Sequence, residues 1–145
     1  MGGAERLAIL DRVMALPGFP KWAGMRLIAA EPGKVTMALK KRPDLTQFFG
    51  HFHGGVITAL ADHAAGAAAT TAMPEGKLAV TVEIKINFLG PADGEEIIAR
   101  AETIQAGATI GVVKVEASSQ KAGSERVCAF ATATMRAMDM PAAFR

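Results

Sequence analysis

Apolar and polar residues alternate with a period of two over residues 80–88, and this period predicts a strand with one buried face. The apolar positions of this run are Val80, Val82, Ile84, Ile86 and Phe88. Three further β-rich runs follow at residues 95–105, 109–120 and 125–136, separated by short turns that contain glycine. The second half of the chain therefore predicts four consecutive antiparallel strands with one wet side.

The first forty residues predict a helix and a hairpin. Residues 4–16 place apolar side chains on one face and most charged ones elsewhere, which indicates a short amphipathic helix that nearby prolines and a glycine end. Its apolar face holds Leu7, Leu10 and Met14. Residues 25–30 and 34–40 are two β-rich runs, and the proline and glycine between them suit a type II turn.

Between these parts lies a run of about fifteen residues from Gly54 that is dominated by Ala, Val, Leu and Ile and lacks proline. Its apolar residues point in almost every direction around a helix axis, which is typical of a helix buried on all sides. Asp62 is the exception, because a carboxylate there is costly unless it is paired, hydrogen-bonded or beside a wet cleft. The structural alternative is that Asp62 bonds a nearby hydroxyl, a backbone N–H or His63, or lies at a solvent edge.

One long apolar helix among several strands is buried only if the antiparallel sheet curls around it. The expected fold class is α+β, a curved antiparallel sheet of about six strands wrapped around a central buried helix, with a short N-terminal helix. With 145 residues, half of them hydrophobic, the chain suits a single domain over 1–145. No repeat or linker indicates a second domain.

Charge and composition exclude several classes of protein. Sixteen basic and fourteen acidic residues give a formal net charge of +2 without a long basic run, so we expect no nucleic-acid partner. No charge-free apolar stretch has membrane-spanning length and the N-terminus lacks an export signal, so we expect a cytoplasmic protein without a membrane partner. The single cysteine, Cys128, fits a reducing compartment and a packing role.

The helix start at Gly54 and Gly55 is the strongest chemical signal. The first N–H groups of a helix have no partner inside it, and glycine lets a substrate oxygen approach them closely. Together with the positive end of the helix dipole, these donors can hold a developing oxyanion. We therefore expect an oxyanion site at this helix start.

Asp62 follows Gly54 by eight residues, roughly 12 Å along a helix axis. A donor on a carbonyl oxygen and a carboxylate attacking the same carbonyl carbon lie within about 6 Å of each other. One chain therefore does not supply both groups to one substrate. If they act together, the helices of two subunits run antiparallel and build two equivalent sites, which predicts an obligate homodimer.

The predicted elements follow one another in a characteristic order. A hairpin and a loop come first, followed by a helix that starts at His53-Gly54-Gly55 and carries an acid eight residues after its first glycine. Strands with a Gly-Pro-Ala turn come last. This order resembles the hotdog-fold acyl-CoA thioesterases, particularly the phenylacetate-degradation type, over residues 24–136. The resemblance implies the hotdog fold and hydrolysis of an acyl- or aryl-CoA thioester to free acid and CoA, without a cofactor or a metal. We also expect the homodimer to pair into a homotetramer.

The resemblance assigns roles to individual residues. It implies that the Gly54 N–H polarises the thioester carbonyl and that Asp62 either attacks this carbonyl or activates a water. Gln47 falls where the family has Asn or Gln to position the water or the thioester, and Thr81 where some relatives carry a residue that assists the water. Phenylacetate-type members combine Asn with Asp, and aryl-thioesterase relatives combine Gln with Glu. This chain mixes the two patterns, so the resemblance does not choose the substrate.

Structural alternatives exist for these residues. His53, which matches the histidine before the family glycine, is either a base or, as we prefer, holds the loop by bonding a backbone group. Gln47 can orient a water while staying neutral, or it is an exposed loop residue. Thr81 can equally be an ordinary strand residue.

The acyl group is expected beside small helix side chains and loop aromatic residues. The small side chains are Ala64, Ala65, Ala67 and Ala68. The residues expected to contact substrate are Gly55, Phe48 and Phe52. Aromatic residues and alanines are also ordinary core material.

Other functions stay open. The segment 48–52, with His51, faintly resembles the histidine loop of hotdog hydroxyacyl dehydratases, which favours a hydratase or dehydratase as one alternative. A non-catalytic acyl-CoA binding module is another. A phosphate-binding helix start is disfavoured because no lysine follows Gly54 and Gly55. A metal site is disfavoured by the spacing of His51, His53, Asp62 and His63.

Overall fold

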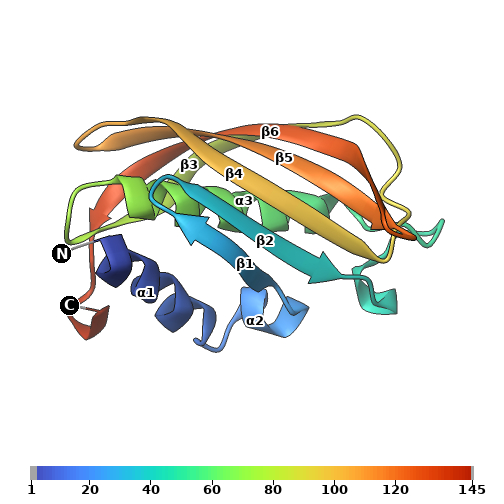
Figure 1. Cartoon of the computed structure of the whole chain (residues 1–145), viewed down its shortest axis with the longest axis horizontal. Helices are drawn as coiled ribbons and strands as arrows, with labels where there is room; N and C mark the ends of the chain where they lie inside the picture. The colour runs from blue at the N-terminus through green and yellow to red at the C-terminus, as the bar shows by residue number, and fades with distance from the viewer. Residues whose placement is uncertain (1–2, 145) are drawn as a thin grey trace.

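One antiparallel sheet of six strands curves over a long helix, α3 (Gly54–Ala72), in the computed structural model, which describes residues 3–144 (Figure 1). Helix α1 (Gly3–Met14) packs against α3 and the first strand, and the short α2 (Phe19–Ala23) follows it. The predicted α+β class is therefore confirmed, including the central helix and the short N-terminal helix. No helix within residues 3–144 has the length and hydropathy needed to span a bilayer.

All predicted strands are present. They are β1 (Arg26–Glu31), β2 (Lys34–Lys40), β3 (Lys77–Phe88), β4 (Glu96–Ala106), β5 (Ile110–Lys121) and β6 (Ser124–Asp139). Their order in the sheet is β1-β2-β4-β5-β6-β3, with antiparallel neighbours throughout. Strand β3 therefore pairs with β6 and not with β4, its neighbour in sequence. Within the sheet described, one side of β3 has no partner strand.

Strand β3 departs from the expected pattern at a β-bulge between Thr81 and Glu83. A bulge inserts one residue and exchanges the faces of the side chains beyond it. Ile84, after the bulge, packs on the core, whereas Val80 and Val82 are 47% and 60% exposed. The prediction that all five apolar residues of this run share one buried face is therefore wrong for these two valines, and also for Phe88, which is 53% exposed at the end of the strand.

Helix α3 has a buried and a half-buried side. It is 19 residues long, longer than the run of about fifteen predicted from its apolar residues. The residues completely buried against the sheet are Leu60, Ala61, Ala64, Ala65, Ala68 and Ala69. Asp62, Gly66 and Ala67 are only half-buried. The prediction of a helix buried on all sides is wrong for a single chain, because the sheet covers one side and α1 covers part of the other.

Two arginines fasten helix α1 to the rest of the chain. The Arg6 guanidinium donates to the Met73 carbonyl at 2.8 Å, just after the end of α3. The Arg12 guanidinium donates to the Ala143 carbonyl at 2.9 Å, in a short 3-10 helix near the C-terminus. Both arginines bond backbone oxygens far away in sequence, so α1 is a fixed part of the fold.

Strand β6 carries Cys128 on its buried side. This residue has no exposed surface, and its burial raises the pKa of the thiol to about 11. The expected packing role of Cys128 agrees with this position, because a protonated, enclosed thiol is chemically inert.

Candidate active site

The loop before α3 is fixed by backbone hydrogen bonds on both sides. His53 N donates to the Leu45 carbonyl at 3.0 Å, and Phe52 N donates to the Ala92 carbonyl at 3.0 Å. The Phe52 side chain is 3% exposed and belongs to the core. In a single chain, Phe52 therefore packs beneath the loop instead of lining a space for a ligand.

The start of α3 leaves one backbone donor free. Gly55 N donates to His53 Nδ1 at 2.9 Å, and Val56 N donates to the His53 carbonyl at 2.9 Å. Gly54 N has no acceptor within residues 3–144. His53 thus caps the helix, which is the role that we preferred for it, and Gly54 alone offers an N–H to an incoming oxygen.

Gly54 lies beneath an aromatic ring. A Cβ atom at this position would be 3.1 Å from Cζ of Phe88, whose side chain is 53% exposed at the end of β3. Any side chain at position 54 would therefore push the ring aside. The glycine allows the ring and a free N–H to lie next to each other.

Asp62 forms a close hydrogen bond with the edge strand. Thr81 Oγ1 donates to Asp62 Oδ1 at 2.6 Å, the short distance typical of a hydroxyl bonded to a charged carboxylate. Within residues 3–144, the second carboxylate oxygen has no hydrogen-bond partner. The bulge of β3 places Thr81 on the side that faces α3. One oxygen of Asp62 is thereby oriented while the other stays available for chemistry.

A cavity of about 210 Å³ adjoins this pair, between α1, α3 and β3. Its polar wall contains Asp62, His63 and Thr81. Its other lining residues include Ile9, Val13, Met14, Leu27, Ala67 and Leu78. The space next to the carboxylate is therefore mainly apolar.

His63 lies between this cavity and α1. Its Nε2 is 3.0 Å from the Met14 sulfur. Burial lowers the pKa of His63 below its usual value, although the neighbouring Asp62 carboxylate acts in the opposite direction. At neutral pH the imidazole is therefore uncharged, which suits an apolar cavity.

Gln47 binds its own loop. Its Oε1 accepts hydrogen bonds from Phe49 N at 2.6 Å and His51 N at 3.3 Å. Its amide NH₂ has no partner within residues 3–144. The Phe48 side chain at the tip of this loop is 89% exposed. Gln47 therefore shapes the loop through its oxygen and keeps its donor free.

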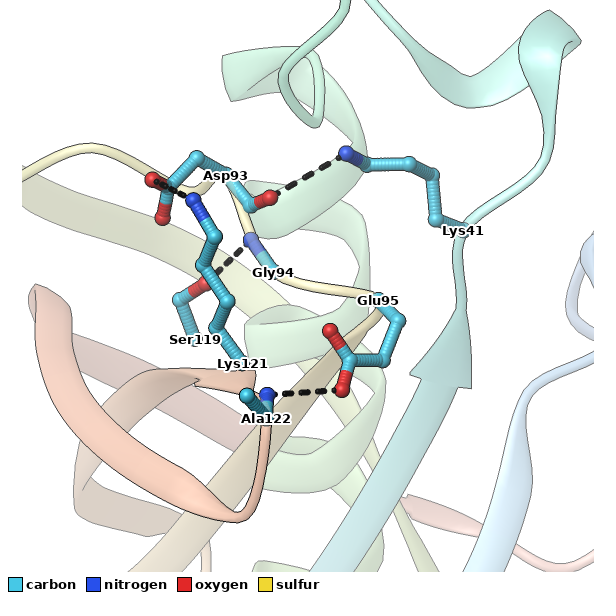
Figure 2. A network of polar contacts seen from close by, with 7 residues as sticks. All are labelled: Lys41, Asp93, Gly94, Glu95, Ser119, Lys121 and Ala122. Atoms are coloured by element: carbon cyan, nitrogen blue, oxygen red, sulfur yellow. Dashed lines mark hydrogen bonds and ion pairs between the residues drawn. The ribbon is translucent and has the colours of Figure 1, made fainter.

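Figure 2 shows a polar network around Asp93 and Gly94, in the segment that follows Ala92. Asp93 accepts a hydrogen bond from Lys121 at 3.0 Å, which lowers the pKa of the Asp93 carboxyl. Gly94 N donates to the buried Ser119 Oγ at 2.8 Å. A Cβ atom at Gly94 would collide with the Gln120 carbonyl oxygen, so only glycine fits there. Because Ala92 next to this network accepts the hydrogen bond from Phe52 N, the network positions the segment that leads to Gly54.

The structure brings only some of the predicted site residues together. Asp62 and Thr81 are in contact, and Gly54 and His53 lie at the helix start eight to nine residues earlier. Within one chain, Gly54 and Asp62 are separated by about 12 Å of helix. They do not reach the same carbonyl group. Of the four alanines expected to leave space, Ala67 lines the cavity and the other three pack on the sheet.

Four residues of α1 line the cavity, and the pattern of residues 4–16 predicts only part of this wall. Leu10 and Met14 belong to the predicted apolar face, whereas Ile9 and Val13 lie outside it. These two residues widen the apolar stripe of α1. A wide stripe indicates a helix that contacts more than one surface, and this signal could have identified them.

Comparison with known proteins gives consistent matches. A family model described as the thioesterase superfamily matches residues 49–125, more than half of the chain. Human acyl-coenzyme A thioesterase 13 is 30% identical over 98 residues, which cover 67% of this chain and 69% of that protein. A 1,4-dihydroxy-2-naphthoyl-CoA hydrolase of Listeria monocytogenes is 28% identical over 103 residues, 71% of this chain and 84% of that protein.

Solved structures share the fold. A thioesterase family protein from Silicibacter pomeroyi superposes with a TM-score of 0.88 at 34% identity, covering 95% of this chain and 99% of that one. The E. coli PaaI protein from the phenylacetic acid degradation operon superposes with a TM-score of 0.85 at 19% identity, covering 95% of this chain and 96% of that one. The chain therefore belongs to the thioesterase superfamily and is a thioester hydrolase with the hotdog fold.

Proposed function

We propose that the protein hydrolyses an acyl- or aryl-CoA thioester to the free acid and CoA, with Asp62 as nucleophile or general base. The Gly54 N–H of the partner subunit is the oxyanion donor. The observation that carries this proposal is the Asp62 carboxylate, oriented by Thr81 at 2.6 Å in the wall of an apolar cavity. The single free N–H at the start of the same helix supports it.

The chemistry needs few groups. Attack on the carbonyl carbon gives a tetrahedral oxyanion, which the Gly54 N–H stabilises. The carbon–sulfur bond then breaks, and the CoA thiolate leaves without needing an acid because it is a good leaving group. If Asp62 attacks, water hydrolyses the resulting anhydride; if Asp62 is the base, it takes the proton of the attacking water. The free amide NH₂ of Gln47 can orient this water or the thioester.

The edge strand β3 supports the homodimer. It is 12 residues long and has one unpaired side, and Val82 in the strand and Leu89 directly after it are about 60% exposed. A long apolar edge is a template for pairing with another strand. Two copies of β3 that pair antiparallel across a twofold axis would also bring their α3 helices antiparallel, as the shared site requires. A homotetramer and a cytoplasmic location stay predictions.

The curated relatives support a CoA thioester as substrate. One is named as a hydrolase of an aromatic CoA thioester and another as an acyl-CoA thioesterase. Both names thus share the CoA thioester, and only the first specifies its acyl group.

Replacement of the carboxylate tests the proposal. CoA released from a panel of acyl- and aryl-CoA thioesters is measured by liquid chromatography. We expect Asp62→Asn to lower kcat/KM by about a hundred- to ten-thousandfold, because it removes the nucleophile or base while keeping the shape. The matched control Asp11→Asn, on the exposed side of α1, should retain activity. An Asp62→Asn protein with normal activity would exclude the mechanism.

The same assay separates the alternatives. A hydratase needs His51, so loss of turnover in His51→Ala with little effect of Gln47→Ala would favour it. Saturable binding of acyl-CoA without release of CoA would favour a binding module. We expect neither outcome, because the curated relatives are named as a CoA thioester hydrolase and an acyl-CoA thioesterase.

A further inference from the structure

We infer that helix α1 determines the size of the acyl group, and that the cavity beside Asp62 accepts a compact acyl group of about eight carbon atoms. This inference rests on the proposed function and names the substrate class of the same site.

The cavity lies where the acyl group of a substrate attacked by Asp62 would lie. Asp62 and Thr81 form part of its wall, so a carbonyl carbon within attacking distance of Asp62, about 3 Å, lies at the cavity boundary. The group attached to that carbon then meets the mainly apolar side chains of the wall. An acyl group is apolar, and its burial there is favourable by about 25 cal/mol per Å².

The volume of the cavity limits the size of the acyl group. An apolar cavity of about 150 Å³ binds benzene, which has six carbons. By proportion, about 210 Å³ holds about eight carbons, either as a chain or as one ring with a short arm. A long-chain acyl group exceeds this volume, so the rest of it would have to leave the apolar cavity or displace wall residues.

Helix α1 supplies part of the cavity wall. Ile9, Val13 and Met14 come from α1, which lies outside residues 49–125 matched by the family model. The wall formed by α1 therefore lies outside the segment that the family model describes. Its position is fixed, because the Met14 sulfur contacts His63 Nε2 at 3.0 Å and Arg6 bonds the Met73 carbonyl.

The chain-length profile tests the inference. We measure kcat/KM for butanoyl-, octanoyl-, dodecanoyl- and hexadecanoyl-CoA. The unmodified protein should have its highest kcat/KM with octanoyl-CoA. Its kcat/KM with dodecanoyl-CoA should be lower by about tenfold or more, since a poorly fitting group reduces kcat/KM by at least that factor. Met14→Ala enlarges the cavity and should raise kcat/KM for dodecanoyl-CoA about tenfold, with octanoyl-CoA changed by less than about threefold. The matched control Met138→Ala, an exposed methionine of β6, should leave the profile unchanged.

A second variant acts in the opposite direction. Ala67→Leu fills the cavity from the α3 side and should lower kcat/KM for octanoyl-CoA about tenfold while butanoyl-CoA is still hydrolysed. Thermal unfolding and circular dichroism verify that each variant is folded. Equal turnover of hexadecanoyl- and octanoyl-CoA by the unmodified protein would overturn the inference. A Met14→Ala protein whose kcat/KM changes by the same factor for every chain length would overturn it as well.

Binding separates this inference from the proposed function. If no CoA thioester is hydrolysed, the proposed function fails. The affinities of octyl- and dodecyl-CoA thioethers, measured by calorimetry with the unmodified protein and Met14→Ala, then still decide whether α1 sets the size limit. The inference is supported if the unmodified protein binds the octyl compound more tightly than the dodecyl compound and Met14→Ala abolishes this difference. Equal affinities of the unmodified protein for the two compounds overturn it.

Discussion

At the residue scale, the Thr81 hydroxyl is the one group within residues 3–144 that orients the Asp62 carboxylate by a hydrogen bond. Asp62 is half-buried on the open side of α3, so without this bond its side chain could adopt other rotamers. A hydrogen bond to a charged group contributes about 1.5–3 kcal/mol. The precision of the proposed attack therefore depends on Thr81, although Thr81 does not contact the reacting carbon in our mechanism.

Removal of this hydroxyl tests its positioning role. We expect Thr81→Val to lower kcat by about ten- to hundredfold with little change in KM, because the carboxylate is still present but less well oriented. Thr81→Ser keeps the hydroxyl and should restore most of the rate. Steady-state kinetics together with thermal unfolding provide the measurement. A Thr81→Val protein that loses stability but not kcat would show that the bond is merely structural.

At the element scale, helix α3 and the strands follow from local patterns, whereas the edge position of β3 does not. The free N–H at Gly54 and the caps of α3 could be predicted because they depend on the few residues around the helix start. The bulge at Thr81 could not, because its register is set by pairing with β6, about fifty residues away. The cavity wall of α1 depends likewise on long-range packing against α3. Sequence periodicity contains neither kind of information.

The edge of β3 gives a prediction about assembly. A lysine on an edge strand opposes pairing with a second strand, so Val82→Lys should raise the dimer dissociation constant at least about tenfold and lower activity in parallel. Ile104→Lys is the matched control, since Ile104 is also an exposed residue at a bulge, in β4. Analytical ultracentrifugation measures the association, and circular dichroism verifies the fold. Unchanged association of the Val82→Lys protein would show that assembly uses another surface.

At the scale of the whole molecule, the proposed site exists only between two chains. One chain separates its free N–H from its carboxylate by about 12 Å of helix. Two chains related by a twofold axis place each N–H beside the other chain's carboxylate and form two sites. Activity then requires the dimer, and a folded monomer should be inactive.

Mixed dimers test the shared site. Gly54→Pro removes the N–H at the first helical position, which tolerates proline, and His53 before it already has the extended backbone that a following proline requires. Gly54→Pro and Asp62→Asn homodimers should both be inactive. After refolding an equal mixture, half of the dimers are mixed and each has one intact site, so about a quarter of the normal activity should return.

Controls make the result of the mixing experiment clear. Gly54→Ala adds the same Cβ beside Phe88 but keeps the N–H, so it should retain more activity than Gly54→Pro. Two differently sized tags show by native electrophoresis whether mixed dimers have formed. Proven mixed dimers without any returning activity would refute a site built from two subunits.

The enclosure of Cys128 beneath the sheet also affects laboratory work on this protein. A dye that reacts with thiols can follow each CoA molecule as it is released, because the chain's single thiol is protonated and inaccessible while the sheet is intact. When denaturant opens the sheet, the same thiol becomes reactive and reports unfolding. One reagent can therefore count turnovers in the native enzyme and time its loss of structure, with no engineered label.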